Sequence, residues 1–270
     1  MRTRRPVTLA AASVVALAGA GAVGLRTLLI RQAAVARRRI GKPLGEQALD
    51  ADRVWRRKKH PGEPVELLLL GDSIAAGLGA AHRRDTLGAR LAKGIARQAG
   101  RPVRLRTAAV VGSETSALSA QVASLPAEYV PDAAVIVVGG NDVTHRIPAA
   151  RSADQLADIV RELRERGVPV VVGTCPDLGT LRAIPQPLRA LAARSSRQLA
   201  SAQAAAVHGA GGRVVALAQA VGPMFAERPD EMFSIDRFHP SALGYRRTAD
   251  ALLPAVLAAL AEPAHPGRNS

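Results

Sequence analysis

The sequence predicts an α/β fold in which helices cover both faces of a parallel β-sheet. Five short apolar runs recur between residues 65 and 217, and segments of helical periodicity separate them. The apolar runs are nearly continuous and do not alternate with polar residues, which is typical of strands buried on both faces. This β/α alternation predicts a three-layer α/β/α arrangement with the sheet in the middle.

The five expected strands are followed by glycines and small polar residues. The strands are Val65–Leu70, Val103–Val110, Ala133–Val138, Val168–Val172 and Val214–Leu217. Four of them end in Gly71-Asp72-Ser73, Gly112-Ser113, Gly139-Gly140-Asn141-Asp142 and Gly173-Thr174-Cys175. Functional groups of parallel sheets gather at the carboxyl ends of the strands. A buried strand has no structural need for these groups, so we expect a functional site along this rim.

The segments between the strands carry helix signals. Asp85 or Thr86 can cap a helix whose Leu87, Leu91 and Ile95 share one face, and Ser152 with Gln155 forms a capping box for the next helix. Two further helical stretches are expected over 188–207 and 241–261, the second interrupted by Pro254.

The N-terminal sixty residues differ from the rest of the chain. Val7 to Leu25 is an uncharged apolar run of 19 residues flanked by arginines, which predicts a hydrophobic helix that is either a signal peptide or a membrane anchor. We therefore expect four parts: an export or anchor segment (1–30), a basic linker (31–62), a globular domain (63–261) and a disordered tail (262–270). The protein is expected to be membrane-associated or exported, in an orientation that the flanking charges do not fix.

Charge and composition exclude several function classes. The formal net charge is +15, but residues 1–60 hold 14 Lys/Arg against 3 Asp/Glu, so the domain itself needs no nucleic-acid partner. The basic linker could lie on anionic lipid headgroups. Aromatic residues make up 2% of the chain, which disfavours surfaces that stack bases or sugars. The single Cys175 excludes a multi-cysteine zinc site, and no metal or nucleotide cofactor motif is present.

Ser73 needs a base to act as a nucleophile, and His239 is the strongest candidate. His239 follows Asp236 by three residues just before a predicted helix, so the carboxylate can reach the imidazole Nδ1 and leave Nε2 for the serine proton. His145, four residues beyond Asn141, is a reserve candidate.

Four blocks of sequence resemble one known family. Gly71-Asp72-Ser73, Gly112, Gly139-Gly140-Asn141-Asp142 and Asp236-x-x-His239-Pro240 are similar, in order, to the blocks of the SGNH (GDSL-like) hydrolases, and the resemblance covers residues 63–261. It implies a flavodoxin-like sheet of five parallel strands in the order 2-1-3-4-5 and the hydrolysis of esters, most often carboxylic esters.

The resemblance also implies residue roles. Ser73 would be the nucleophile, His239 the general base and acid, and Asp236 the group that orients His239. The backbone N–H groups of Ser73 and Gly112 and the side-chain amide of Asn141 would form the oxyanion hole, where each donor is worth on the order of 3 kcal/mol. No cofactor is implied.

Other residues near the rim are weaker candidates. Asp72, Asp142 and Cys175 are possible substrate-pocket residues, although the two aspartates are interpreted mainly as turn residues that bond nearby backbone. Core packing is the preferred interpretation of Met224, Phe225, Met232 and Phe233, with an acyl pocket as the alternative.

The leading hypothesis is therefore a lipase-like or deacetylating serine esterase that acts on a small-molecule, lipid or glycan ester through an acyl-enzyme. An acyltransferase that moves the acyl group to a sugar or lipid hydroxyl is the alternative. A non-catalytic binding protein with the same fold is a further one. The natural ester and the oligomeric state stay open.

Overall fold

The fold is described from a computed structural model that covers residues 6–262, with side chains described for Gly21 and from Val23 onward. The strands are β1 (Val54–Trp55), β2 (Val65–Gly71), β3 (Val103–Thr107), β4 (Ala133–Val137), β5 (Val170–Gly173) and β6 (Arg213–Val215). The longer helices are α1 (Pro6–Ile40), α3 (Leu87–Ala99), α6 (Ala149–Glu165), α7 (Leu188–Gly209) and α11 (Ala242–Leu260). The short helices are α2 (Ser73–Ala76), α4 (Leu118–Ala123), α5 (Gly140–His145), α8 (Leu217–Ala220), α9 (Gly222–Glu227) and α10 (Pro229–Met232), with 3-10 turns η1 (Arg83–Asp85), η2 (Thr115–Ala117) and η3 (Leu178–Thr180).

The central sheet has the order β1-β3-β2-β4-β5-β6. The strands from β2 to β6 are parallel and follow the predicted order 2-1-3-4-5, so the expected fold class is confirmed. The sequence did not predict β1, which pairs antiparallel with β3 through Val54 and Trp55. Two residues are too few to produce a periodic pattern, and this strand lies within residues 31–62, where only a linker was expected.

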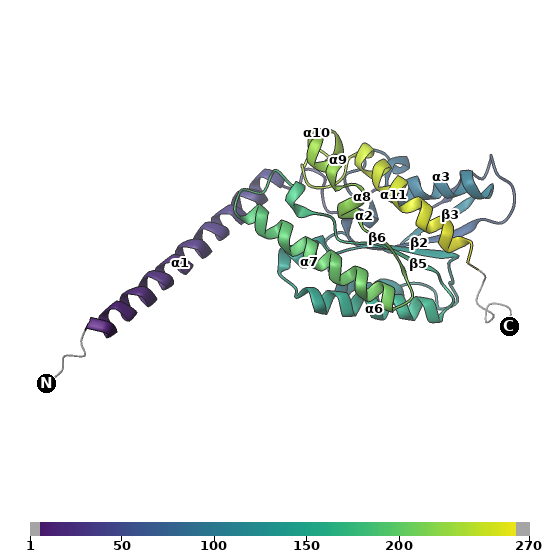
Figure 1. The fold of residues 1–270 in the computed structure, drawn as a ribbon. Coiled ribbons are helices and arrows are strands. Elements are labelled where there is room, and N and C mark those ends of the chain that lie inside the picture. Colours follow the sequence, from purple (N-terminus) through teal and green to yellow (C-terminus); the bar gives the residue numbers. More distant parts are fainter. Residues whose placement is uncertain (1–5, 263–270) are drawn as a thin grey trace.

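The leucine run of β2 is continuous because both faces of the strand are covered. Leu67 and Leu69 face a core cluster that includes residues of α3 and α11, whereas Leu68 and Leu70 face a second cluster that includes residues of α6 and α7. Figure 1 shows these two helix pairs on opposite sides of the sheet. All four leucines are fully buried, and each contributes about 1.5–3 kcal/mol of transfer free energy.

Two helix predictions are confirmed and two are wrong. Thr86, one of the two expected caps, caps α3, and α11 begins where the helical stretch over 241–261 was expected, with Ser241 as its cap. Ser152 does not cap α6, which begins three residues earlier at Ala149. Its hydroxyl instead donates to the buried carboxylate of Asp142, which is a stronger hydrogen-bond acceptor than a neutral oxygen. Pro254 does not interrupt α11, because burial of Leu252 and Val256 around it offsets the lost hydrogen bond.

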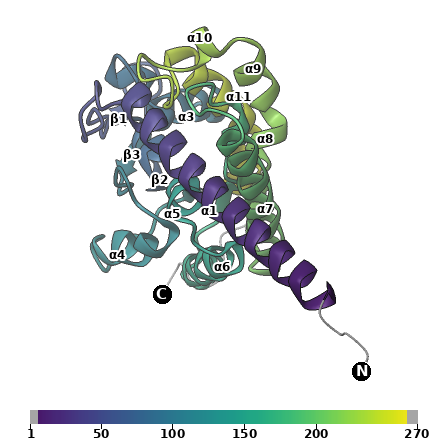
Figure 2. The same ribbon diagram turned by 90° about the vertical axis from the view of Figure 1, so that its left-hand side faces the viewer.

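Helix α1 extends away from the body in both ribbon views and docks through its C-terminal part (Figures 1 and 2). Gln32 hydrogen-bonds the carbonyl of Gln186 and accepts from the N–H of Leu188 at 2.9 Å, and Ala36 belongs to a small apolar cluster with Leu181. Most side chains of the apolar run Val7–Leu25, and all of residues 263–270, lie outside what is described. In the described part of the chain, no helix has the length and apolar character needed to cross a bilayer.

Candidate active site

Ser73 is presented by a sharp turn at the end of β2. Gly71 has φ +132°, and a Cβ there would lie 1.9 Å from the carbonyl oxygen of Val137 on β4, so only glycine fits. Asp72 then caps α2, its Oδ1 accepting from the N–H of Ile74 at 2.9 Å, which confirms its role as a turn residue. Helix α2 therefore begins at Ser73, which places the serine hydroxyl at the carboxyl edge of the sheet.

A loop before α11 brings Asp236 and His239 to this edge. Asp236 Oδ1 accepts from the backbone N–H groups of Phe238 and His239, both at 3.0 Å, and Oδ2 lies 2.6 Å from His239 Nδ1. The loop is closed by a hydrogen bond from the N–H of Ser234 to the carbonyl of His239 at 2.7 Å. His239 Nε2 lies 2.9 Å from Ser73 Oγ. The three side chains thus form one hydrogen-bonded chain from carboxylate to hydroxyl.

The carboxyl groups of Asp236, in this hydrogen-bonded chain, and of Asp72, next to Ser73, have opposite pKa shifts. Burial alone would raise the pKa of Asp236, but hydrogen bonds from the His239 side chain and from two backbone N–H groups lower it overall. Burial raises the pKa of Asp72 to about 6, against the lowering effects of the bond from Ile74 and of the nearby His239. Asp236 is therefore suited to remain ionised opposite an imidazolium.

Asn141 lies beside Ser73 and is fixed by the loop that follows β3. Its Nδ2 donates to the carbonyl of Ser113 at 2.9 Å, which leaves the second amide hydrogen for another acceptor. Gly112 precedes Ser113 and has φ +83°. Within residues 6–262, the backbone N–H groups of Ser73 and Gly112 donate to no protein acceptor.

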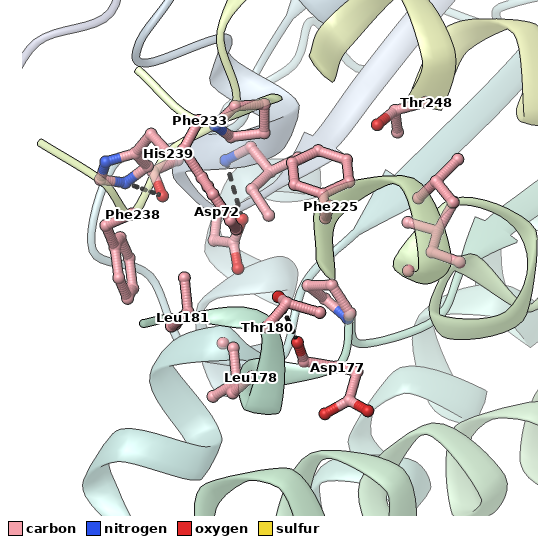
Figure 3. Close-up of a pocket in the computed structure, with 18 of the residues that line it drawn as sticks. Asp72, Asp177, Leu178, Thr180, Leu181, Phe225, Phe233, Phe238, His239 and Thr248 are labelled. Atoms are coloured by element: carbon pink, nitrogen blue, oxygen red, sulfur yellow. Dashed lines mark hydrogen bonds between the residues drawn. The ribbon is translucent and has the colours of Figure 1, made fainter. Parts of the chain in front are cut away.

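A largely apolar cavity of about 70 Å³ opens beside these groups. Its lining includes Ser73, Asn141 and His239 together with Phe225, Phe233 and Phe238, which are all the phenylalanines of the chain. Figure 3 shows Phe238 near His239, with Leu181 and Leu178 on the same side as Phe238, and Phe225 further inside. When a substrate atom lies next to Ser73 Oγ, an apolar group bonded to that atom can be buried in this cavity. A larger hollow of about 830 Å³ shares Phe233 but includes none of the three polar residues.

Several residues expected near the pocket do not reach it. Of the three pocket candidates, Asp72 lines the cavity, but Asp142 and Cys175 do not. Asp142 is buried and accepts from the N–H of Thr115 and from Ser152 Oγ, so it ties α5 to η2 and α6 and does not bond the nearby turn. Cys175 is fully buried, and burial raises the pKa of its thiol well above the usual range. The side chains of Asp142 and Cys175 are thus enclosed within the domain and do not line the cavity.

Among the other residues considered in the sequence, some line the cavity and others do not. The reserve base His145 is exposed, pairs with Glu114 at 2.7 Å and does not line the cavity. Phe225 and Phe233 line it, whereas Met224 and Met232 do not. Across the described residues, no three His, Cys, Asp or Glu side chains are grouped to hold a metal ion.

The sequence analysis missed parts of the cavity wall. Residues 176–178 and 180–181 follow the fourth strand end, Val221 follows the fifth, and Leu217 was expected inside the fifth strand but lies beyond β6. Their position after strand ends was a usable signal, but nothing in their residue types indicates which of them face the cavity.

Comparisons with known proteins agree with this geometry. The model of the GDSL-like lipase/acylhydrolase family matches residues 69–247. The GDSL-like esterase Rv1075c of Mycobacterium tuberculosis is 44% identical over 97% of this chain and 86% of its own length. The chain belongs to the GDSL-like lipase/acylhydrolase family. The fold and the family also place it among the SGNH hydrolases, so it is an enzyme of the ester-hydrolysing type.

Several solved structures share the fold. AlinE4, described as an SGNH-hydrolase family esterase, has a TM-score of 0.52 and 27% identity over 74% of this chain and 98% of its own. TesA has a TM-score of 0.57 and 24% identity over 73% and 98% of the two chains. The lipase/acylhydrolase from Enterococcus faecalis has a TM-score of 0.56 and 22% identity over 71% and 94%.

Proposed function

We propose that this GDSL-like enzyme hydrolyses carboxylic esters through an acyl-enzyme formed on Ser73. The observation that carries the proposal is the chain of contacts from Asp236 Oδ2 to His239 Nδ1 (2.6 Å) and from His239 Nε2 to Ser73 Oγ (2.9 Å). A serine hydroxyl becomes nucleophilic when a base within hydrogen-bond reach removes its proton.

In the first half of the reaction, Ser73 Oγ attacks the ester carbonyl carbon while its proton passes to His239 Nε2. The carbonyl oxygen becomes an oxyanion, and Asp236 stabilises the imidazolium that forms. The intermediate collapses when the C–O bond to the alcohol breaks and His239 gives its proton to the departing oxygen. The acyl group is then bonded to Ser73 Oγ.

In the second half, His239 takes a proton from water, whose oxygen attacks the acyl carbon. Collapse returns the proton to Ser73 Oγ and releases the carboxylic acid. The oxyanion of both halves is stabilised by the N–H groups of Ser73 and Gly112 and by the free amide hydrogen of Asn141. The unengaged state of the two backbone donors, and the orientation of Asn141 by Ser113, support this assignment.

The acyl group occupies the apolar cavity, because Ser73, Asn141 and His239 line it together with three phenylalanines. A volume of about 70 Å³ suits a short acyl chain better than a long one. The proposed substrate is therefore an ester whose acyl chain is short and carries no charged group.

Hydrolysis is tested with p-nitrophenyl esters of graded acyl length, with and without an added alcohol. Release of free acid in both conditions supports the proposal. Formation of a new ester at the expense of free acid would show that an acceptor hydroxyl replaces water, as in an acyltransferase. A full chain that neither releases p-nitrophenol nor reacts with a fluorophosphonate would contradict both forms of the chemistry.

The apolar run Val7–Leu25 supports a location at or beyond a membrane. A fluorophosphonate label applied to fractionated cells tests this location, since it reports the compartment that holds the reactive serine. Labelled protein confined to the soluble cytoplasmic fraction would contradict it.

A further inference from the structure

Gln121 pairs with the last residue of the strand that leads to Ser73. Its side chain lies on α4 and is 4% exposed. Oε1 accepts from the N–H of Gly71, and Nε2 donates to the carbonyl of the same residue, each at 2.8 Å. β3 ends at Thr107, which pairs with Leu69, so no residue of β3 pairs with Gly71. Beyond β3, the N–H of Val110 donates to the carbonyl of Gly71 at 3.1 Å. The carboxamide is therefore a second donor to that carbonyl, and it takes the place of a strand partner for the N–H of Gly71 at the point where β2 turns into the active site.

The same carboxamide contacts the loop that carries Gly112. Gln121 Nε2 lies 3.4 Å from Ser113 Oγ, and the carbonyl of Ser113 accepts from Asn141 Nδ2 at 2.9 Å. One buried side chain is thus bonded to the backbone two residues before Ser73 and to the residue after Gly112. Through Ser113 it is also linked to Asn141. Ser73, Gly112 and Asn141 carry the donors assigned to the oxyanion.

We propose that Gln121 is a positioning residue that sets the relative placement of the three oxyanion donors. This inference rests on the proposed function. Donors act on an oxyanion only when they lie about 2.7–3.1 Å from the position that it will occupy, so a small displacement of one donor weakens its effect. The oxyanion exists only after attack, and for this reason loss of Gln121 lowers kcat much more than it changes KM.

A purely structural role is the alternative, and Gln203 provides the matched control for it. Gln203 is fully buried on α7. Its Oε1 accepts from the N–H of Cys175 at 2.7 Å and its Nε2 donates to the carbonyl of Val138 at 3.0 Å. Each glutamine accepts from one backbone N–H and donates to one backbone carbonyl near the carboxyl ends of the strands, but Gln203 bonds two different residues and has no bond to Gly71 or Ser113.

The first experiment compares Gln121→Met with Gln203→Met in the full chain. Gln203→Met removes the glutamine partner of both the N–H of Cys175 and the carbonyl of Val138, whereas Gln121→Met leaves the N–H of Gly71 without a partner but not its carbonyl, to which Val110 still donates. The shift of the urea unfolding midpoint is therefore expected to be at least as large in Gln203→Met as in Gln121→Met. With p-nitrophenyl butyrate, we expect Gln121→Met to lower kcat by about 30-fold and Gln203→Met to lower it by less than about 5-fold, both with little change in KM. Equal losses of kcat in the two variants would overturn the inference.

Ser113→Ala tests the same network with a smaller perturbation, which keeps the inference open to contradiction if Gln121→Met does not fold. It removes the hydroxyl that Gln121 contacts and retains the carbonyl that holds Asn141. A decrease of kcat of about 3-fold or more at constant KM is expected. An unchanged kcat, together with loss of fold in Gln121→Met, would mean that Gln121 serves the fold alone.

A double-mutant cycle with Asn141→Ala separates this inference from the proposed function. If Gln121 acts through the oxyanion donors, Gln121→Met costs a smaller factor in kcat when Asn141 is already alanine. Factors that multiply independently would overturn the positioning role. An unchanged kcat in Asn141→Ala alone would instead remove the proposed role of Asn141, and this inference with it. A large loss in Asn141→Ala and none in Gln121→Met would leave the proposed function intact.

Discussion

His239 Nε2 lies 2.9 Å from Ser73 Oγ, although 166 residues separate the two in the sequence. The contact depends on two rigid pieces of backbone: the Gly71 turn, which fixes the serine, and the closed loop before α11, which fixes the imidazole. No side chain needs to move to form it. Proton transfer from the hydroxyl can therefore begin from the geometry of the free enzyme.

Ser73→Ala should abolish ester hydrolysis and leave the fold unchanged. The hydroxyl is the nucleophile, and an alanine methyl group occupies the same space without a reactive oxygen. Initial rates with p-nitrophenyl butyrate measure hydrolysis, fluorophosphonate labelling reports the reactive serine, and circular dichroism reports the fold. Ser119→Ala, on the exposed face of α4, is the control and should keep both rate and label. Substantial turnover by folded Ser73→Ala would contradict the assignment.

Asn141→Ala should lower kcat by about 100-fold, which corresponds to about 2.7 kcal/mol, with a smaller change in KM. The amide hydrogen that is not bonded to Ser113 stabilises charge that exists only after attack. Asn141→Asp is a useful comparison, because a carboxylate of the same shape opposes the oxyanion and should be at least as damaging. Steady-state kinetics separate the constants, and a loss confined to KM would place Asn141 in substrate binding.

Asp72→Asn should change how stability depends on pH. The pKa of Asp72 is about 6 in the folded enzyme and near 3.8 in the unfolded chain, so the folded state holds its proton more tightly. The stabilisation of the fold by this raised pKa is fully present below pH 3.8 and is lost as the pH rises through about 6. Between pH 4 and 7, the wild type should therefore lose up to about 3 kcal/mol of unfolding free energy relative to the variant.

Urea unfolding of both proteins at pH 4, 5, 6 and 7 measures this difference. Asp236, whose pKa is lowered, has the opposite dependence and destabilises the fold as the pH falls through its folded pKa. It is present in both proteins and cancels in the comparison. A difference in unfolding free energy that stays constant over this range would show that Asp72 is not held protonated by its burial.

Phe225→Leu should shift the preference toward longer acyl chains. Phe225 lies in the cavity wall with its ring 4.9 Å from that of Phe233, and the smaller leucine extends the apolar space. The ratio of kcat/KM for octanoate over butyrate esters should rise several-fold. Leu163→Val, in the core on the other face of the sheet, controls for general loss of packing and should leave the ratio unchanged. A ratio unaffected by Phe225→Leu would place the acyl group elsewhere.

Most of the fold was predictable because its signals are local. The continuous apolar runs identified all five parallel strands, and Thr86 and Ser241 marked the start of two helices. The failures have a common cause. Ser152 looked like a cap, but its hydroxyl bonds Asp142, which is close in space and not part of the same helix turn. Likewise, Val54 and Trp55 form a strand only because the edge of β3 is available to them.

By itself, the sequence determined which residue types stand at the strand ends and that Asp236 lies one turn from His239. The tertiary structure alone decided which of these groups face a common cavity. Asp72 and Asp142 are both aspartates at strand ends, yet Asp72 lines the cavity while Asp142 is enclosed by Thr115 and Ser152. The direction of a side chain at a sheet edge depends on the turn that carries it and on the partners packed against that turn, which come from distant parts of the chain.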